Sequence, residues 1–434
     1  MFRQLSILLF ITLILPPDIA IAQTEKKDGN ASTIELIKWS RSKETLKSSI
    51  MMEPAGQLHV LARGGEKSFM VELGELIFRS PLTLGGNARR LGLSCNSCHT
   101  SGAVNTAFFI PVLSDQPGNI DVSHHLWNSL DDDSLDNPIN IPSLRGIRWT
   151  APYGRDGRTQ SLLEFSRNVI VGEFGGRALH PLLLDALVAY QREFAFLPNN
   201  IFDSTGKLTT SASVEKKRGE ILFQRDCINC HIPTSVYTDG RSHDVGTNGY
   251  FDTPTLLGLS ETSPYFHDGR SPDLLSVVKH FERVLDLNYG PIQRADLTSF
   301  LEALGAVDIL PMPINLARDM TQITEFAALL EIPISDENFL LVERISDMLR
   351  FELKRIYERF PKTIHKAQRA ILTTLSIDLQ DIVDDARVGK YGRASQRLVS
   401  WRQRSVAAVE ILEAAVSTSL YDPNMTKAIN SGTN

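Results

Sequence analysis

The stretch Cys95-Asn96-Ser97-Cys98-His99 decides the fold of this chain, and it recurs as Cys227-Ile228-Asn229-Cys230-His231. In the pattern C-x-x-C-H, two thiols form thioether bonds to a porphyrin and the histidine ligates its iron, so each copy predicts a covalently bound c-type haem. The two copies contain all four cysteines of the 434-residue chain. A zinc site would need further Cys or His residues at ligand spacing, and a disulfide would not explain the histidine. We therefore predict two haems, ligated by His99 and His231.

The composition and the N-terminus limit the class of protein. Hydrophobic residues make up 42% of the chain and charged residues 22%, which is typical of a globular protein, and the formal net charge is −6. No basic stripe stands out, so we do not expect nucleic-acid binding. Met1-Phe2-Arg3, the apolar run 5–15 and Ala20-Ile21-Ala22 have the pattern of a signal peptide that is cleaved after residue 22. The apolar run is short for a stable membrane anchor, so we predict export to the periplasm.

A second pair of segments indicates an internal repeat. Pro142–Arg158 aligns without gaps on Pro254–Arg270, and nine of the seventeen positions are identical. A helical pattern also precedes each haem motif, at Val71–Phe78 and at Gly219–Phe223. Because both pairs of segments occur in the same order, the sequence predicts an all-α fold with two tandem cytochrome c-like haem domains.

Beyond the repeat the chain changes character. Pro311-Met312-Pro313 interrupts it, and apolar residues then recur at helical spacing, as at Ile345, Leu349 and Ile356. We predict a C-terminal helical, bundle-like extension whose apolar stripes form a core rather than a groove for a partner. The predicted organisation has five parts: a signal peptide (1–22), a lead-in with a helix (23–66), the first cytochrome c-like domain (67–206), the second (207–308) and the helical extension (309–434).

The repeated segments carry a resemblance to a known family. Leu73–Phe78, Ser94–His99, Pro142–Arg158 and Thr253–Arg270 together resemble the bacterial diheme cytochrome c peroxidase and MauG superfamily over about residues 67–306. The resemblance implies that the haem of the first domain reacts with hydrogen peroxide and that the haem of the second domain passes electrons. It also implies a calcium ion between the domains.

In the first domain the resemblance assigns the distal acid to Glu173, which would move a proton during peroxide cleavage. The alternative is that Glu173 is an exposed loop residue. Two positions depart from the family pattern: Phe165 stands where a glutamine is frequent, and Arg155 stands where a tryptophan is frequent. His124 or His125 is a possible iron ligand in the first insert, although we favour a haem with an open coordination position.

In the second domain the family's Met or Tyr ligand falls on Phe281, which cannot bind iron. The neighbouring His280 is a possible distal ligand, and an ordinary packing role is the alternative. The positions that match the family's calcium ligands are Asn140, Thr262 and Pro264. Asn140 would instead cap a turn if no ion binds.

These features together predict a periplasmic diheme c-type oxidoreductase. It would reduce hydrogen peroxide with electrons from a small redox protein, either a cytochrome c or a cupredoxin. The first alternative is a MauG-like enzyme that uses peroxide at haem to oxidise side chains of a partner protein. The second alternative is an electron-transfer cytochrome without an open iron.

Overall fold

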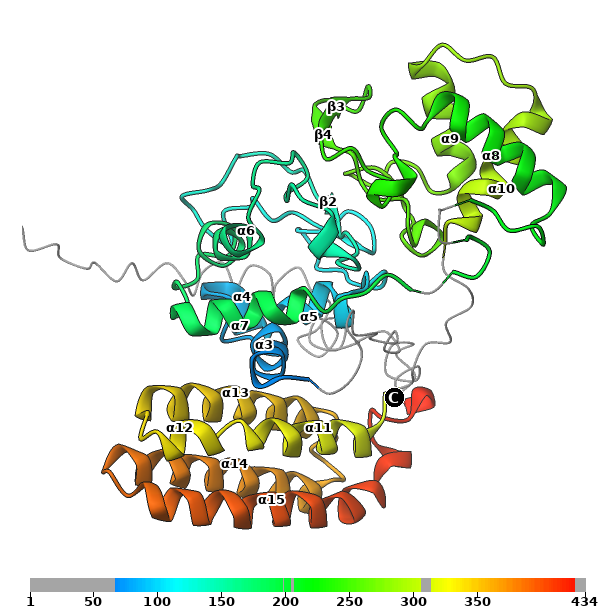
Figure 1. The fold of residues 1–434 in the computed structure, drawn as a ribbon. Coiled ribbons are helices and arrows are strands. Elements are labelled where there is room, and N and C mark those ends of the chain that lie inside the picture. Colours follow the sequence, from blue (N-terminus) through cyan, green and yellow to red (C-terminus); the bar gives the residue numbers. More distant parts are fainter. Residues whose placement is uncertain (1–66, 198, 204–206, 306–313, 426–434) are drawn as a thin grey trace, which may run out of the picture.

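A computed structural model describes residues 67–197, 199–203, 207–305 and 314–425. We call residues 67–197 the first half, residues 207–305 the second half and residues 314–425 the C-terminal helices (Figure 1). The predicted signal peptide (1–22) and the predicted helix in the lead-in (23–66) lie outside the described residues. The described part is mostly helical with only short strands, which confirms that the fold class is helical, as predicted.

The first half begins with α3 (Phe69–Arg79), whose first turn is capped by the Ser68 hydroxyl accepting from the Val71 N–H. Its apolar side packs against α7 (Pro181–Gln191). The other helical elements of this half are α4 (Gly86–Leu91), α5 (Cys95–Cys98), α6 (Leu162–Asn168), a π-helical turn (Val169–Glu173) and 3₁₀ turns at Thr100–Gly102 and Ile147–Trp149. A short antiparallel hairpin joins β1 (Asn119–Ile120) to β2 (Ile139–Asn140).

The second half repeats this plan with fewer elements. Its principal helices are α8 (Val214–Asp226), α9 (Leu274–Val284) and α10 (Pro291–Ala303), with 3₁₀ turns at Pro233–Ser235 and Leu259–Glu261. β3 (Ser242–Asp244) pairs antiparallel with β4 (Tyr250–Asp252). These elements enclose an apolar core of their own, in which Phe223 and Phe300 are almost fully buried.

One glycine in each half fixes the same close helix contact. A Cβ atom added to Gly74 of α3 would lie 2.0 Å from the Ala186 carbonyl oxygen of α7. A Cβ atom on Gly219 of α8 would lie 2.1 Å from the Asp296 carbonyl oxygen of α10. Any larger side chain would push these helices apart, so both contacts require glycine.

The two halves meet through a reciprocal pair of backbone hydrogen bonds. In the ungapped alignment of the repeats, Asn140 corresponds to Asp252, and Arg155 corresponds to His267. The Asn140 N–H donates to the His267 carbonyl at 2.7 Å, and the Asp252 N–H donates to the Arg155 carbonyl at 2.8 Å. The backbone at the end of each hairpin thus donates a hydrogen bond to the other half. The acceptor in each case is the residue that directly precedes the Asp-Gly-Arg sequence of that other half. The contact has the form of a two-fold interface.

The C-terminal helices follow the predicted apolar spacing. They are α11 (Leu316–Ala328), α12 (Glu331–Ser335), α13 (Phe339–Glu358), α14 (Lys366–Arg387) and α15 (Tyr391–Glu413), with a 3₁₀ turn at Val416–Thr418. Ile345, Leu349 and Ile356 of α13 are buried, as the pattern predicts. Trp401 of α15 is fully buried and donates its indole N–H to the Leu375 carbonyl of α14 at 2.8 Å.

The C-terminal helices lie against the first half, and the second half lies at the far side of the molecule from them (Figure 1). α11 and α13 contact α3, and one continuous apolar core includes both groups of helices. At this junction Arg79 of α3 forms an ion pair with Glu352 of α13 at 3.2 Å. Among the described residues, no helix is both long and apolar enough to cross a membrane.

Candidate haem and peroxide site

The first C-x-x-C-H segment forms a single helical turn, α5. Ser94 precedes it, and the Ser94 N–H donates to the Ser97 hydroxyl at 3.0 Å, which closes the start of the turn. The Nδ1 atom of His99 lies 2.9 Å from the Pro142 carbonyl oxygen, which fixes the ring and leaves Nε2 for a ligand. Burial lowers the pKa of His99 to about 4, so the imidazole is neutral, as metal ligation requires.

The second segment has the same arrangement after α8. The Nδ1 atom of His231 lies 2.9 Å from the Tyr237 carbonyl oxygen, and burial lowers the pKa of this histidine. None of the four cysteines forms a disulfide. Unpaired thiols beside a histidine whose Nδ1 is held by a carbonyl are the donors that covalent haem requires, so both segments fit the predicted group.

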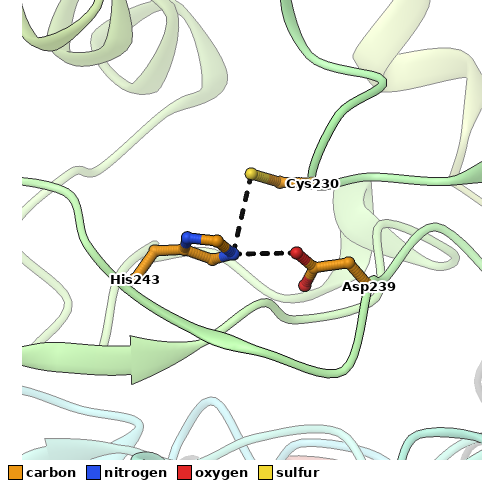
Figure 2. A group of neighbouring side chains, drawn as sticks. All are labelled: Cys230, Asp239 and His243. Carbon is orange, nitrogen blue, oxygen red and sulfur yellow. Dashed lines mark hydrogen bonds and ion pairs between the residues drawn. The ribbon is translucent and has the colours of Figure 1, made fainter.

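Figure 2 shows a further polar cluster beside the second segment. The Nε2 atom of His243 lies 2.8 Å from an Asp239 carboxylate oxygen and 3.8 Å from the Cys230 sulfur. The three side chains are close enough to hold a metal ion together. The Cys230 sulfur is, however, one of the predicted attachment points of haem. The Asp239–His243 pair therefore lies beside a predicted attachment point of haem, which argues against a separate metal site.

Glu173 ends the π-helical turn after α6, and its side chain is 25% exposed. The Arg158 guanidinium donates to a Glu173 carboxylate oxygen at 2.9 Å and to Asp156 at 3.0 Å. Burial raises the pKa of Glu173, and the positive charge of Arg158 opposes that rise. The structure thus brings the predicted acid next to an arginine that sequence reasoning did not assign to the site.

Aromatic rings cover the apolar side of this pair. The guanidinium of Arg158 lies 5.5 Å from the centre of the Phe165 ring, and Phe165 stacks on Tyr153 at 6.1 Å between ring centres. Phe165, which stands where the family frequently has glutamine, therefore contacts the arginine that binds Glu173. The sequence signal for Arg158 was its place in the repeated Asp-Gly-Arg, which by itself indicated only a repeat.

The other candidate iron ligands have partners of their own. The rings of His124 and His125 contact each other at a tilt of 31°, with 4.1 Å between ring centres, and Nδ1 of His124 accepts from the Leu126 N–H at 3.1 Å. His280 is buried on α9, where its Nε2 lies 2.7 Å from the Val245 carbonyl oxygen. Iron ligation through that nitrogen would require this hydrogen bond to break. The ligand roles of all three histidines stay predictions.

The candidate calcium ligands lie at the contact between the halves. The Asn140 side-chain amide donates to the Pro264 carbonyl oxygen at 2.5 Å. The Thr262 hydroxyl donates to the Leu259 carbonyl at 3.0 Å. The Arg155 guanidinium donates to the Asn140 carbonyl. The structure therefore brings Asn140 and Pro264 together and adds a positive charge beside them.

Comparison with known proteins gives consistent relatives, although no protein-family model matches the chain. The γ subunit of hydrazine synthase from Kuenenia stuttgartiensis is 23% identical over 275 residues, which is 49% of this chain and 72% of the relative. MauG of Methylorubrum extorquens is 24% identical over 298 residues (54% and 78%). Cytochrome c551 peroxidase of Nitrosomonas europaea is 23% identical over 292 residues (55% and 80%). The chain is thus similar to members of the diheme cytochrome c peroxidase and MauG superfamily. These relatives support an oxidoreductase role at the level of that superfamily.

Solved structures include two similar chains. Hydrazine synthase of Kuenenia stuttgartiensis, pressurised with xenon, has 20% identity and a TM-score of 0.39 over 59% of this chain and 92% of that chain. A MauG-like protein associated with microbial copper homeostasis has 16% identity and a TM-score of 0.41 over 58% and 93%. Within the superfamily, members named for peroxide reduction and members named MauG match this chain about equally well.

Proposed function

We propose that this protein is a periplasmic diheme c-type peroxidase. Hydrogen peroxide would react in the first half, with His99 as the iron ligand and Glu173 as the proton-transfer group. The second half, with His231, would receive electrons from a small redox protein such as a cytochrome c or a cupredoxin. The observation that carries the proposal is the carboxylate of Glu173, held by Arg158 in a partly buried, aromatic-lined position.

Each proposed haem would be attached through the two thiols of its segment, Cys95 and Cys98 in the first half and Cys227 and Cys230 in the second. Haem held in this way supplies an iron that exchanges electrons with peroxide and with a donor protein. The overall reaction converts hydrogen peroxide, two electrons and two protons into two molecules of water. The protein must therefore move protons between the two oxygens of the substrate.

Glu173 suits this proton transfer because two opposing effects act on its carboxyl group. Burial raises its pKa, which favours proton uptake, while the Arg158 charge keeps the carboxylate available as a base. The ion pair also orients the carboxylate, since Arg158 is itself held by Asp156. Phe165 and Tyr153 supply apolar surface on one side of the pair, and the side chains of Arg158 and Glu173 stay 45% and 25% exposed.

A MauG-like oxidation of protein side chains is the second candidate. Two MauG proteins are among the relatives at 24% identity, one of them over 54% of this chain. The C-terminal helices would then give a protein substrate additional surface close to the first half. Under this alternative, peroxide consumption would need a specific partner protein instead of a small electron donor.

The test is peroxide turnover by the haem-loaded Glu173→Gln variant with a reduced cytochrome c as donor. Loss of general acid–base assistance slows turnover by a factor of about 10²–10⁴. Glu164→Gln is the matched control, because Glu164 is an exposed glutamate on α6, one helix earlier. Haem content and the resting absorption spectrum should stay the same in both variants, since neither residue is a proposed iron ligand. A Glu173→Gln enzyme within a few-fold of the parent would refute the assigned role.

A further inference from the structure

The two sides of the contact between the halves carry different side chains although their backbone bonds correspond. On one side, the Arg155 guanidinium donates to the Asn140 carbonyl, and the Asn140 amide donates to Pro264. On the other side, His267 stacks flat on Phe251, with 3.8 Å between ring centres. Of the two corresponding positions, the one in the first half therefore holds an arginine (Arg155), and the one in the second half holds a histidine (His267).

Calcium does not fit the donor set around Asn140. A calcium ion takes six to eight oxygen ligands at about 2.3–2.6 Å. The candidate residues Asn140, Thr262 and Pro264 are all uncharged, and one of the candidate ligand oxygens, the Pro264 carbonyl, already accepts a hydrogen bond. Pro264 accepts from the Asn140 amide at 2.5 Å, and the Asn140 carbonyl accepts from Arg155.

The charge of Arg155 also opposes a second cation at this place. Desolvation lowers the pKa of Arg155 to about 10, so the guanidinium stays positive at neutral pH. The carboxylate that favours this charge is Asp268, which belongs to the other half. Asp268 is in turn held by Arg270, whose Nε lies 2.8 Å from it. Two like charges in a partly desolvated contact repel more strongly than they do in water.

We propose that the guanidinium of Arg155 is the cation that joins the two halves of this chain, and that no calcium ion binds at Asn140, Thr262 and Pro264. The side chain belongs to the first half and contacts the Asn140 carbonyl at the hairpin end that binds the second half, and the negative charge of Asp268 in the second half favours its charged form. A covalently held cation cannot dissociate or be removed by a chelator. The contact between the halves is therefore independent of calcium concentration.

The experiment uses the haem-loaded full chain and needs no peroxide, so its failure is separable from failure of the proposed function. Calcium content per chain is measured by atomic emission after dialysis against calcium chloride and then against calcium-free buffer. Thermal unfolding is followed with excess EGTA and with millimolar calcium chloride. We expect negligible bound calcium in the parent protein and the same unfolding temperature in both solutions.

Substitution of the arginine provides the second arm. Arg155→Met should lower the unfolding temperature by about 5 °C, because it removes a charged hydrogen bond from the contact. Arg155→Lys should recover part of this loss, since it keeps the charge. Arg177→Met is the matched control, because Arg177 is exposed, and it should leave the unfolding temperature unchanged.

Two results would overturn the proposal. One is close to one calcium ion per parent chain together with a lower unfolding temperature in EGTA. The other is an Arg155→Met protein as stable as the Arg177→Met control. Uptake of calcium by Arg155→Met but not by the parent would support the proposal, because it would show that the guanidinium charge excludes the ion.

Discussion

Glu352→Gln tests whether the C-terminal helices and the first half form one structural unit. Glu352 lies on α13, is 2% exposed, and pairs with Arg79 of α3 at 3.2 Å. The same carboxylate oxygen accepts from Nε of Arg355 at 3.2 Å. Arg355 also reaches Asp319 at 3.2 Å. The substitution keeps the volume of the side chain and removes only its negative charge.

The expected cost follows from this geometry. Removing one partner of a buried ion pair costs about 3–5 kcal/mol, because the remaining charge stays desolvated. Arg355 keeps Asp319 as a second anion, so we expect the lower end, about 3 kcal/mol. At roughly 2–4 °C per kcal/mol for a chain of this size class, the unfolding temperature falls by about 6–12 °C.

The assay follows thermal unfolding by far-ultraviolet circular dichroism and by the Soret absorption of the attached haem. If the helices share one core with the first half, both signals shift together in Glu352→Gln. Glu413→Gln serves as the control, because Glu413 is an exposed glutamate at the end of α15. A shift of less than about 1 °C would refute the energetic argument. Loss of helix at a temperature where the Soret band is unchanged would refute the shared unit.

Two further predictions concern the second half. If His280 is the distal ligand, His280→Ala should turn the second haem from low-spin to high-spin in the optical and spin-resonance spectra. Unchanged spectra would leave His280 with its hydrogen bond to Val245 as its role. Burial, with the nearby Asp239 charge, raises the pKa of Asp252 from 3.8 to about 7. The folded state then binds a proton more tightly than the unfolded state, so this group lowers stability as pH rises from about 4 to about 7. The stability gain of Asp252→Asn over the parent should grow across that interval in denaturant titrations, and a pH-independent difference would contradict the shift.

Local patterns account for the part of the fold that the sequence predicted correctly. The superfamily followed from two haem motifs in order with two Asp-Gly-Arg segments, and the relatives confirm it. The helix α13 followed from apolar residues at helical spacing, of which Ile345 and Leu349 are fully buried. Such patterns are readable because residues three and four positions apart lie on one face of a helix. The domain boundaries, the haem ligands and Glu173 stay predictions. The predicted calcium site is untested, and we propose instead that no ion binds there.

Contacts between residues far apart in the sequence could not be predicted from such patterns. Glu173 and Arg158 are fifteen positions apart, and their ion pair depends on a π-helical turn that no local propensity indicates. Arg155 was visible only as a departure from a family pattern. Its contact with the Asn140 carbonyl depends on how the hairpin folds back onto the loop.

The sequence by itself determined the two C-x-x-C-H segments, the internal repeat and the helical class of this protein, because each is encoded by short-range spacing of residue types. Only the tertiary structure decided that the C-terminal helices share a core with the first half, and that the two halves exchange reciprocal backbone bonds. It also decided that a guanidinium lies at the candidate calcium site. These contacts join residues far apart in the chain. Their energies come from burial, charge and shape at the point of contact, which no local pattern specifies.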